Sequence, residues 1–305
     1  IFNKKLINNT INYVVDKYSK HFITYGDKKY GIQKKRLSYQ AKQLRFFDSI
    51  NVYGKESLSE DFKNKYSEIL SQHQGGGFWI WKSFLLLNLL NKTKNNDVIL
   101  YLDAGSTLNP NGVKRLQEYF DTLYHSDKSF LRFDIGLEEK YWTSKEVFKY
   151  FNLEIDSNYG NSNQLAGGIL FIKNTQESKL FFEEFFKVID SDQKLITNHY
   201  KNNQVDGFRY PRHDQSILSL MGKIYGSIII PDETYFHENP KDQYEYPILT
   251  VRDGNYNFWQ KIKYYILYFQ NIKKIIYFGE KQFYFKKTSI YKRLKIKLIS
   301  KIKNY

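Results

Sequence analysis

The chain has 305 residues, enough for one large α/β domain with an appendage or for two small domains. It has no cysteine, which excludes disulfides, thiolate zinc sites and cysteine nucleophiles. The net charge of +15 is uneven, because residues 259–305 contain thirteen Lys and Arg and a single acid, Glu280. The remaining 258 residues therefore carry only +3 and resemble an ordinary globular protein. No signal peptide and no run of 18 apolar residues is visible.

Apolar patterning predicts strands that alternate with helices along the first 256 residues. Strands are expected over 21–26, 97–102, 129–135, 165–173 and 227–231. Helices are expected over 39–50, 58–70, 81–92, 111–124, 176–189 and 213–225. This alternation indicates a doubly wound, mainly parallel (mixed) sheet flanked by helices, with ligands at the carboxyl ends of the strands. We expect residues 1–256 to form this domain and residues 257–305 to form a basic, helical C-terminal region.

The apolar run over 98–102 ends abruptly in Asp103 and a glycine turn. Asp103 has three interpretations: it caps the turn into the next helix, opens a phosphate loop, or holds a metal and a diphosphate. The phosphate-loop interpretation rests on Asp103, Gly105 and Thr107, a D-x-G-x-T match to the actin and sugar-kinase superfamily. That superfamily also needs a second D-x-G far downstream, whereas residues 134–136 follow too closely.

The metal and diphosphate interpretation has a chemical rationale, because a divalent ion neutralises the charge that develops as a nucleoside diphosphate leaves. It also has support from six segments that occur in order: YGDKKYGIQKKRLSYQAKQLRFFDSI, GGGFWIWKSFLLLNLL, DVILYLDAGSTLN, QLAGGILFIKNT, RHDQSILSLMGKIYG and YPILTVRDGN. Together they resemble bacterial and viral nucleotide-sugar glycosyltransferases of the GT-A fold, of the kind found in capsule and lipopolysaccharide gene clusters. The resemblance covers about residues 20–255 and implies sugar transfer to a glycan or lipid-linked glycan acceptor.

The resemblance implies a divalent metal, Mn²⁺ or Mg²⁺, held by an Asp-x-Asp motif at the end of a central strand. This chain has Gly105 in place of the second acid, so one carboxylate, Asp103, remains. A hard cation needs several oxygen ligands, which the diphosphate and water can supply in part. His237 is expected to complete the metal site; its alternative role is a loop histidine packed on neighbouring aromatic rings.

A UDP- or GDP-sugar donor is the expected substrate. The residues expected to contact it are Thr24, Tyr25, Gly26, Arg45, Lys82, Asp103, Gly105, Gln164, Gly167 and Arg252. Tyr25 is placed to stack on the base, and Lys82, which follows a glycine-rich segment, to pair with a phosphate. The alternatives are a plain strand end for Tyr25 and a solvated helix-end lysine for Lys82. Trp79 and Trp81 are interpreted as core or pocket wall.

Two acids are candidates for catalysis. Asp214 begins a predicted helix, where an aspartate commonly satisfies free amides and the helix dipole. The resemblance implies that it instead faces the acceptor sugar and serves as general base if the enzyme inverts. Asp134 is the alternative acid, near the donor sugar, and His213 is a possible assistant.

The basic region mixes lysines with aromatic residues and ends in an amphipathic pattern. Tyr291, Leu294, Leu298, Ile302 and Tyr305 fall on one helical face, with basic residues on the others. This pattern is typical of a peripheral helix on an anionic membrane, here the inner face of the membrane of a cytoplasmic enzyme. Nucleic-acid binding and packing onto the domain are the alternatives for this region. The rival functions for the whole chain are an actin-like sugar kinase or ATPase and a non-enzymatic adaptor that binds membrane or nucleic acid.

Overall fold

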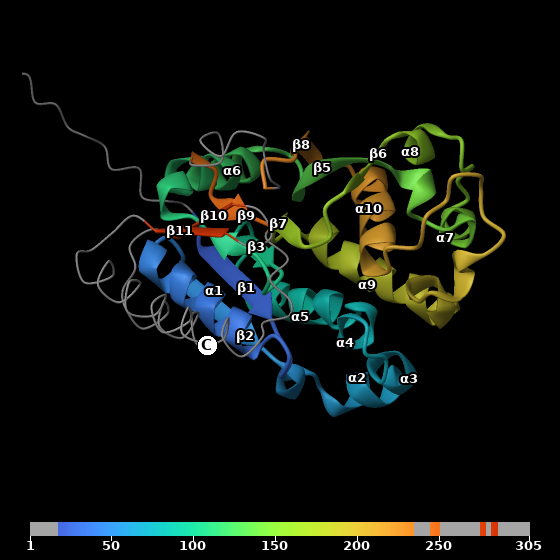
Figure 1. The fold of residues 1–305 in the computed structure, drawn as a ribbon, viewed down its shortest axis with the longest axis horizontal. Helices are drawn as coiled ribbons and strands as arrows, with labels where there is room; N and C mark the ends of the chain where they lie inside the picture. Colours follow the sequence, from blue (N-terminus) through green and yellow to red (C-terminus); the bar gives the residue numbers. More distant parts are fainter. Residues whose placement is uncertain (1–17, 235–244, 251–274, 279–281, 286–305) are drawn as a thin grey trace, which may run out of the picture.

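The computed structural model describes residues 18–234, 245–250, 275–278 and 282–285. Within them, a central seven-stranded sheet has the order β2-β1-β3-β7-β5-β6, and β8 also pairs with β5 (Figure 1). The strands are β1 (Lys20–Tyr25), β2 (Ser49–Tyr53), β3 (Val98–Leu102), β5 (Phe130–Glu138), β6 (Asn163–Leu165), β7 (Ile169–Lys173) and β8 (Ile228–Pro231). This α/β architecture with a mixed sheet confirms the predicted fold class.

Strand direction explains where a site can form. β1 is parallel to β2 and β3, and β5 is parallel to β8, whereas β7 is antiparallel to both β3 and β5. β6 is antiparallel to β5, so five of the seven strands share one direction. The carboxyl ends of β1, β3 and β5 therefore lie at one edge, together with the beginning of β7.

Helices cover both faces of the sheet (Figure 1). The α-helices are α1 (Gly31–Leu44), α2 (Glu60–Lys65), α3 (Ser67–Leu70), α4 (Gly75–Phe78), α5 (Trp81–Leu90), α6 (Val113–His125), α7 (Lys145–Tyr150), α8 (Asn158–Asn161), α9 (Gln176–Ser191) and α10 (Asp214–Ile224). Short 3₁₀ turns are η1 (Lys55–Ser57), η2 (Pro110–Gly112), η3 (Glu139–Tyr141), η4 (Gln193–Ile196) and η5 (His199–Lys201).

The central strand β3 shows why an unbroken apolar run forms a strand here. All five of its residues are buried, and they alternate between two cores. Ile99 and Tyr101 face the core formed with α5, α9 and α10, whereas Val98 and Leu100 face the core formed with α1 and α6. Both faces need apolar side chains because helices cover both, as in other parallel sheets.

Three predicted elements differ from the structure, and the first is the helix predicted over 58–70, which Tyr66 divides into α2 and α3. The helix predicted over 39–50 begins at Gly31 and ends at Leu44, and Arg45 closes it in the left-handed conformation, with φ 51°. The end of that predicted helix is part of β2, whose β-branched Ile50 and Val52 suit a strand and which pairs with β1. The strand predicted over 165–173 is interrupted at 166–168, so β6 and β7 are separate strands that both pair with β5.

Smaller strand pairs lie outside the central sheet. β4 (Thr107–Leu108) pairs with β9 (Ile248–Leu249), which fastens the chain near residue 250 to the loop after β3. In the basic region, β10 (Ile275–Phe278) pairs with β11 (Gln282–Phe285), so this stretch is extended and not helical. The amphipathic helix predicted over 291–305 lies outside the described residues. Across the described ranges, no helix combines the length and apolarity that a membrane crossing requires.

Candidate functional site

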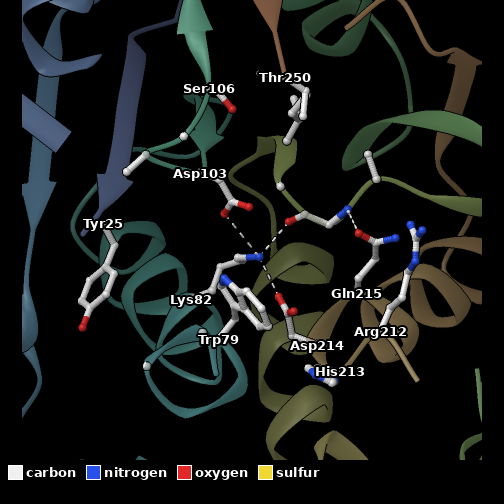
Figure 2. A pocket seen from close by; sticks show the side chains of 18 of the residues that line it. Tyr25, Trp79, Lys82, Asp103, Ser106, Arg212, His213, Asp214, Gln215 and Thr250 are labelled. Atoms are coloured by element: carbon white, nitrogen blue, oxygen red, sulfur yellow. Dashed lines mark hydrogen bonds and ion pairs between the residues drawn. The ribbon is translucent and has the colours of Figure 1, made fainter. Parts of the chain in front are cut away.

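A cavity of about 1020 Å³ opens at the edge where β1, β3 and β5 end. Its walls come from the loops after β1 and β3, the turn before α5, the beginning of β7, the start of α10 and the end of β8. Such an edge is the usual ligand site of an open α/β sheet, and the volume suits a ligand of drug size. Figure 2 shows Tyr25 on one side of the cavity and Arg212 with Gln215 on the other.

Lys82 lies at the centre of this cavity wall and is only 2% exposed. Its Nζ donates to Asp214 Oδ2 at 2.6 Å and to the Gly167 carbonyl at 2.8 Å, and lies 3.7 Å from Asp103 Oδ1 (Figure 2). The Tyr101 ring lies under the ammonium group, 5.1 Å from its centroid. Lys82 thus connects the end of β3, the segment before β7 and the start of α10 through one buried charge, and it makes two hydrogen bonds within the protein.

The carboxyl group of Asp214 is buried, with 5% of the side chain exposed. Burial raises its pKa to about 6, against the opposing effect of the Lys82 ammonium. Its neighbour His213 is also buried, and burial together with the Lys82 charge lowers the histidine pKa to about 4. At neutral pH, therefore, Asp214 is the counter-ion of Lys82 and His213 is neutral.

The loop after β3 presents Asp103 to the cavity. Its side chain is 40% exposed, and Oδ1 accepts a hydrogen bond of 2.5 Å from the Tyr101 hydroxyl. Its backbone N–H donates to the Gly168 carbonyl at 2.9 Å. Buried Arg36 of α1 holds the rest of the loop, because its guanidinium donates to the Ser106 carbonyl at 2.8 Å and to the Thr107 hydroxyl.

Two glycines allow β7 to begin against the Asp103 loop and α10. A Cβ at position 168 would lie 2.6 Å from Asp103 Oδ2, and one at position 167 would lie 2.6 Å from Gln215 Cβ. Both distances are too short for a side chain, so the close approach requires glycine. The contacts that require glycine here are made within the protein, and the predicted contact of Gly167 with the donor stays a prediction.

The turn that leads into α5 is left-handed. Residues 75–79 all have positive φ, including the non-glycine residues Phe78 and Trp79. Each non-glycine residue in this conformation costs about 1–2 kcal/mol, and such backbone strain clusters at functional sites. Trp79 lines the cavity, and its ring centroid lies 5.7 Å from that of His213, which also has positive φ.

The cavity brings together Tyr25, Gly26, Lys82, Asp103, Gly105, Gly167 and Asp214 of the predicted residues. Tyr25 is 7% exposed and stacks on Trp81, with the ring centroids 3.7 Å apart. One ring face is thus already covered, although the residue borders the cavity. Lys82 is buried and forms an ion pair with Asp214. This environment differs from the solvated helix end that was the alternative interpretation, and the ammonium is already paired where a phosphate was expected.

Four predicted residues do not line the cavity. Thr24 is fully buried and its hydroxyl donates to the Leu102 carbonyl, so it joins β1 to β3. Arg45 lies at the opposite edge of the sheet, because α1 runs away from the cavity. Gln164 is fully buried behind Gln215, and Asp134 of β5 accepts hydrogen bonds from the Gly136 N–H and from the side chain of Asn163 on β6. Of these four, Thr24, Gln164 and Asp134 make side-chain hydrogen bonds within the protein.

His237 and Arg252 lie outside the described residues. Among the residues the structure does describe, no group of three or more His, Asp or Glu is placed to hold a metal ion. Asp103 faces the Lys82 ammonium, which competes with a cation for its oxygens. The described donor set therefore does not by itself fit a resident divalent ion.

The sequence prediction missed several cavity residues. Asp27 follows β1, and its Oδ1 accepts from the backbone N–H of Lys29 and Tyr30, which shapes the loop beside Tyr25. Gln215 lines the cavity next to Asp214, and Asp232 lies where β8 ends. The only sequence signal for Asp27 and Asp232 was their position at strand ends; Gln215 is recognised only from the contacts of α10.

No family model and no curated protein sequence matches the chain. Solved structures do match. A glycosyltransferase involved in the glycosylation of the major capsid of PBCV-1 is 11% identical, with TM-score 0.47, over 81% of this chain and 99% of that chain. The bifunctional glycosyltransferase WbbM is 14% identical, with TM-score 0.44, over 83% of this chain and 44% of that chain. The galactosyltransferase LgtC, in complex with donor and acceptor sugar analogues, is 13% identical, with TM-score 0.42, over 81% of this chain and 95% of that chain.

Proposed function

We propose that the chain is a glycosyltransferase of the GT-A type that binds a nucleotide-sugar in the cavity. One observation carries this proposal: separate segments singled out by the sequence resemblance meet at a single cavity. Gly26, Lys82, Asp103, Gly167 and Asp214 come from positions up to 188 residues apart, yet all line it. The cavity lies at the carboxyl edge of the sheet, where an α/β fold binds nucleotides.

The charge of the cavity bears on how a diphosphate could bind. Among the described residues that line it, the charged ones are four aspartates and three Lys or Arg residues: Asp27, Asp103, Asp214, Asp232, Lys29, Lys82 and Arg212. These seven described side chains sum to a charge of −1, which disfavours a free diphosphate beside them. This supports a divalent cation, Mn²⁺ or Mg²⁺, that enters with the nucleotide, with Asp103 and the predicted ligand His237 as the protein donors. Binding of metal and nucleotide would then be mutually dependent.

The residues suit positioning of the donor more than proton transfer. Asp214 is buried and paired with Lys82. In this geometry its carboxylate is not open to an acceptor hydroxyl, as a general base would need to be. The Lys82 charge instead holds Asp103 and the Gly167 carbonyl in fixed places beside the cavity. Such preorganised groups contribute to catalysis by orienting the substrate and stabilising developing charge.

The actin-like interpretation is not favoured by the loop geometry. Thr107, the last residue of the D-x-G-x-T match, is 1% exposed, and its hydroxyl binds Arg36. Thr107 also belongs to β4, which pairs with β9 and not with a neighbouring strand of the central sheet. The loop therefore lacks the phosphate-binding hairpin that a sugar kinase or ATPase of this type requires.

Calorimetric titration of UDP, GDP and ATP, with and without Mn²⁺, tests the proposed function. We expect UDP or GDP to bind with Mn²⁺, and Asp103→Ala to weaken that binding by about tenfold or more, or about 1.4 kcal/mol. Asp127→Ala is the matched control, because that carboxylate is 85% exposed and does not line the cavity. Failure of both nucleoside diphosphates to bind would contradict the proposal, and binding of ATP alone would select the kinase.

We further propose that the acceptor is a glycan or lipid-linked glycan of surface polysaccharide synthesis and that the enzyme acts on the cytoplasmic face of a membrane. The support is the net charge of +12 in residues 259–305, together with the aromatic and amphipathic pattern there. Basic amphipathic segments bind anionic bilayers reversibly. An enzyme held at that surface would meet a lipid-linked acceptor there.

A further inference from the structure

A fully buried carboxylate lies behind the cavity, in a part of the fold that the proposed function does not use. Glu139 of η3 is 0% exposed and forms an ion pair of 2.9 Å with Lys223 of α10. It also accepts hydrogen bonds from Thr143 at 2.5 Å, from Gln164 Nε2 at 3.0 Å and from the Ser219 hydroxyl. Its lone pairs are thus satisfied by four donors, as a buried charge requires.

The charge of Glu139 determines the orientation of two amide side chains. An ionised carboxylate only accepts, so the group of Gln164 that faces it must be the NH₂. The Gln164 oxygen then faces Gln215, whose Nε2 donates to it at 2.7 Å. The Gln215 oxygen is left to accept the backbone N–H of Gly167 at 3.1 Å. No amide in this series can rotate without placing two acceptors against each other.

The series ends at the central ion pair of the cavity. The N–H of Gly167 is held by Gln215, and its carbonyl accepts from Lys82 Nζ (Figure 2). The preceding carbonyl, that of Ala166, accepts from fully buried Arg132 at 3.0 Å. Both peptide groups at the beginning of β7 are thereby fixed by buried side chains, and the glycines would otherwise leave them free to rotate.

We propose that Glu139 and Gln164 are positioning residues that act through Gln215 to hold the Gly167 peptide, and with it Lys82, in the conformation the ligand meets. The path runs along one face of α10, from a buried ion pair near its C-terminal end to the cavity wall at its N-terminal end. The path depends on the donor and acceptor direction of each hydrogen bond. A substitution that turns one donor into an acceptor therefore disrupts the hydrogen bonds between that residue and the cavity. The proposal rests on the proposed function only for the choice of ligand.

Gln164→Glu tests the direction of the hydrogen bonds with almost no change in shape. The charged groups around the new carboxyl are Glu139, Lys223 of α10 and Arg132 of β5, and Asp134 lies on the adjoining part of β5. Two neighbouring buried carboxyls hold one proton between them, and with that proton the series still closes. Once both carboxyl groups ionise, the oxygens of Glu139 and of the new glutamate face each other without a proton between them. The new side chain is then displaced, and Gln215 loses its hydrogen-bond acceptor.

Two readouts apply, each at about pH 5 and about pH 9. Hydrogen exchange and NMR shifts of the Gln215 side-chain amide should match the wild-type protein at the lower pH and lose protection at the higher. The affinity for UDP or GDP with Mn²⁺, divided by that of the wild-type protein at each pH, should fall by about tenfold between the two. Gln176→Glu, the same change at an exposed position of α9, should show neither transition.

An unchanged Gln215 amide in Gln164→Glu at both pH values would overturn the proposal. If that variant does not fold at the higher pH, Gln215→Met is the second test, since it leaves the Glu139 cluster intact. There the Gly167 N–H should exchange about tenfold faster, and wild-type exchange would again overturn the proposal. If no nucleoside diphosphate binds the wild-type protein, the proposed function fails, while the NMR readout still decides this proposal.

Discussion

The adjacent residues His213 and Asp214 have pKa values that burial shifts in opposite directions. Both lie beside Lys82, and burial disfavours the charged form of each. For the histidine this lowers the pKa from 6.5 to about 4, and for the aspartate it raises the pKa from 3.8 to about 6. Each shift makes folding stability depend on pH over nearly the same range.

The signs of the two effects are opposite. Between about pH 4 and 6, His213 binds fewer protons in the folded state, so its contribution to stability rises with pH. In the same range Asp214 binds more protons in the folded state, so its contribution is present at low pH and is lost as pH rises through about 6. In the wild-type protein the two contributions largely cancel.

Replacement of the histidine should therefore expose the dependence on Asp214. In His213→Asn, the free energy of unfolding should fall by roughly 2–3 kcal/mol between pH 4 and 6 relative to the wild-type protein. Urea denaturation across this range measures it. His199→Asn, at an exposed histidine, is the control and should follow the wild-type profile. A parallel profile for His213→Asn would contradict the assignment of opposing shifts.

At the scale of elements, the site depends on how closely β7 begins against the end of β3. Asp103 and Gly168 are joined by a backbone hydrogen bond of 2.9 Å, and the register places Leu102 opposite Ile169. A side chain at position 168 would meet the Asp103 carboxylate. The orientation of Asp103 therefore requires that position 168, just before β7, has no Cβ.

Gly168→Ala should displace the Asp103 carboxylate while the rest of the sheet remains paired. We expect nucleoside diphosphate affinity to fall by about tenfold, with a smaller loss of stability. Gly31→Ala is the matched control, because no atom lies within 4 Å of a Cβ there and the residue is helical. That control should bind normally and be as stable or slightly more stable. Normal binding by Gly168→Ala would show that the position of Asp103 does not matter.

Elements were predictable to the extent that local patterns set them. β3 was recognisable because apolar residues occupy both of its faces. α9 was recognisable because apolar residues recur along a single face of the helix. The predicted helix over 39–50 ran into the first two residues of β2, because this short, partly exposed strand carries little periodicity and its pairing with β1 decides its conformation. The interruption at 166–168 was hidden by a continuous apolar run that belongs to two strands.

At the scale of the whole molecule, positive charge is concentrated near the C-terminus of the sequence. Residues 259–305 carry +12 of the total charge of +15. Attraction to an anionic bilayer contributes up to about 1 kcal/mol for each basic residue near the surface and is screened by salt. Membrane attachment is thus predicted to depend on this region and not on the nearly neutral remainder.

We expect the full chain to sediment with vesicles of phosphatidylserine and phosphatidylcholine, and to be released at high salt. Pure phosphatidylcholine vesicles should retain little protein. Substitution by glutamine at Lys292, Arg293, Lys295 and Lys297 should abolish most binding. The same substitution at four exposed lysines of the domain, Lys28, Lys35, Lys92 and Lys94, should not. Salt-sensitive DNA binding without vesicle binding would favour the adaptor in place of a membrane-bound enzyme.

The sequence alone determined the α/β class, the position of Asp103 at the end of a central strand and the concentration of positive charge near the C-terminus. These depend on composition and on patterns within single elements, which the chain displays directly. The tertiary structure decided what the candidate residues do: Lys82 is a buried counter-ion, Thr24 and Gln164 support the wall, and Asp27 and Gln215 belong to the cavity. Such roles depend on contacts between residues far apart in the chain, and burial, which sets both charge state and hydrogen-bond direction, exists only once those contacts form.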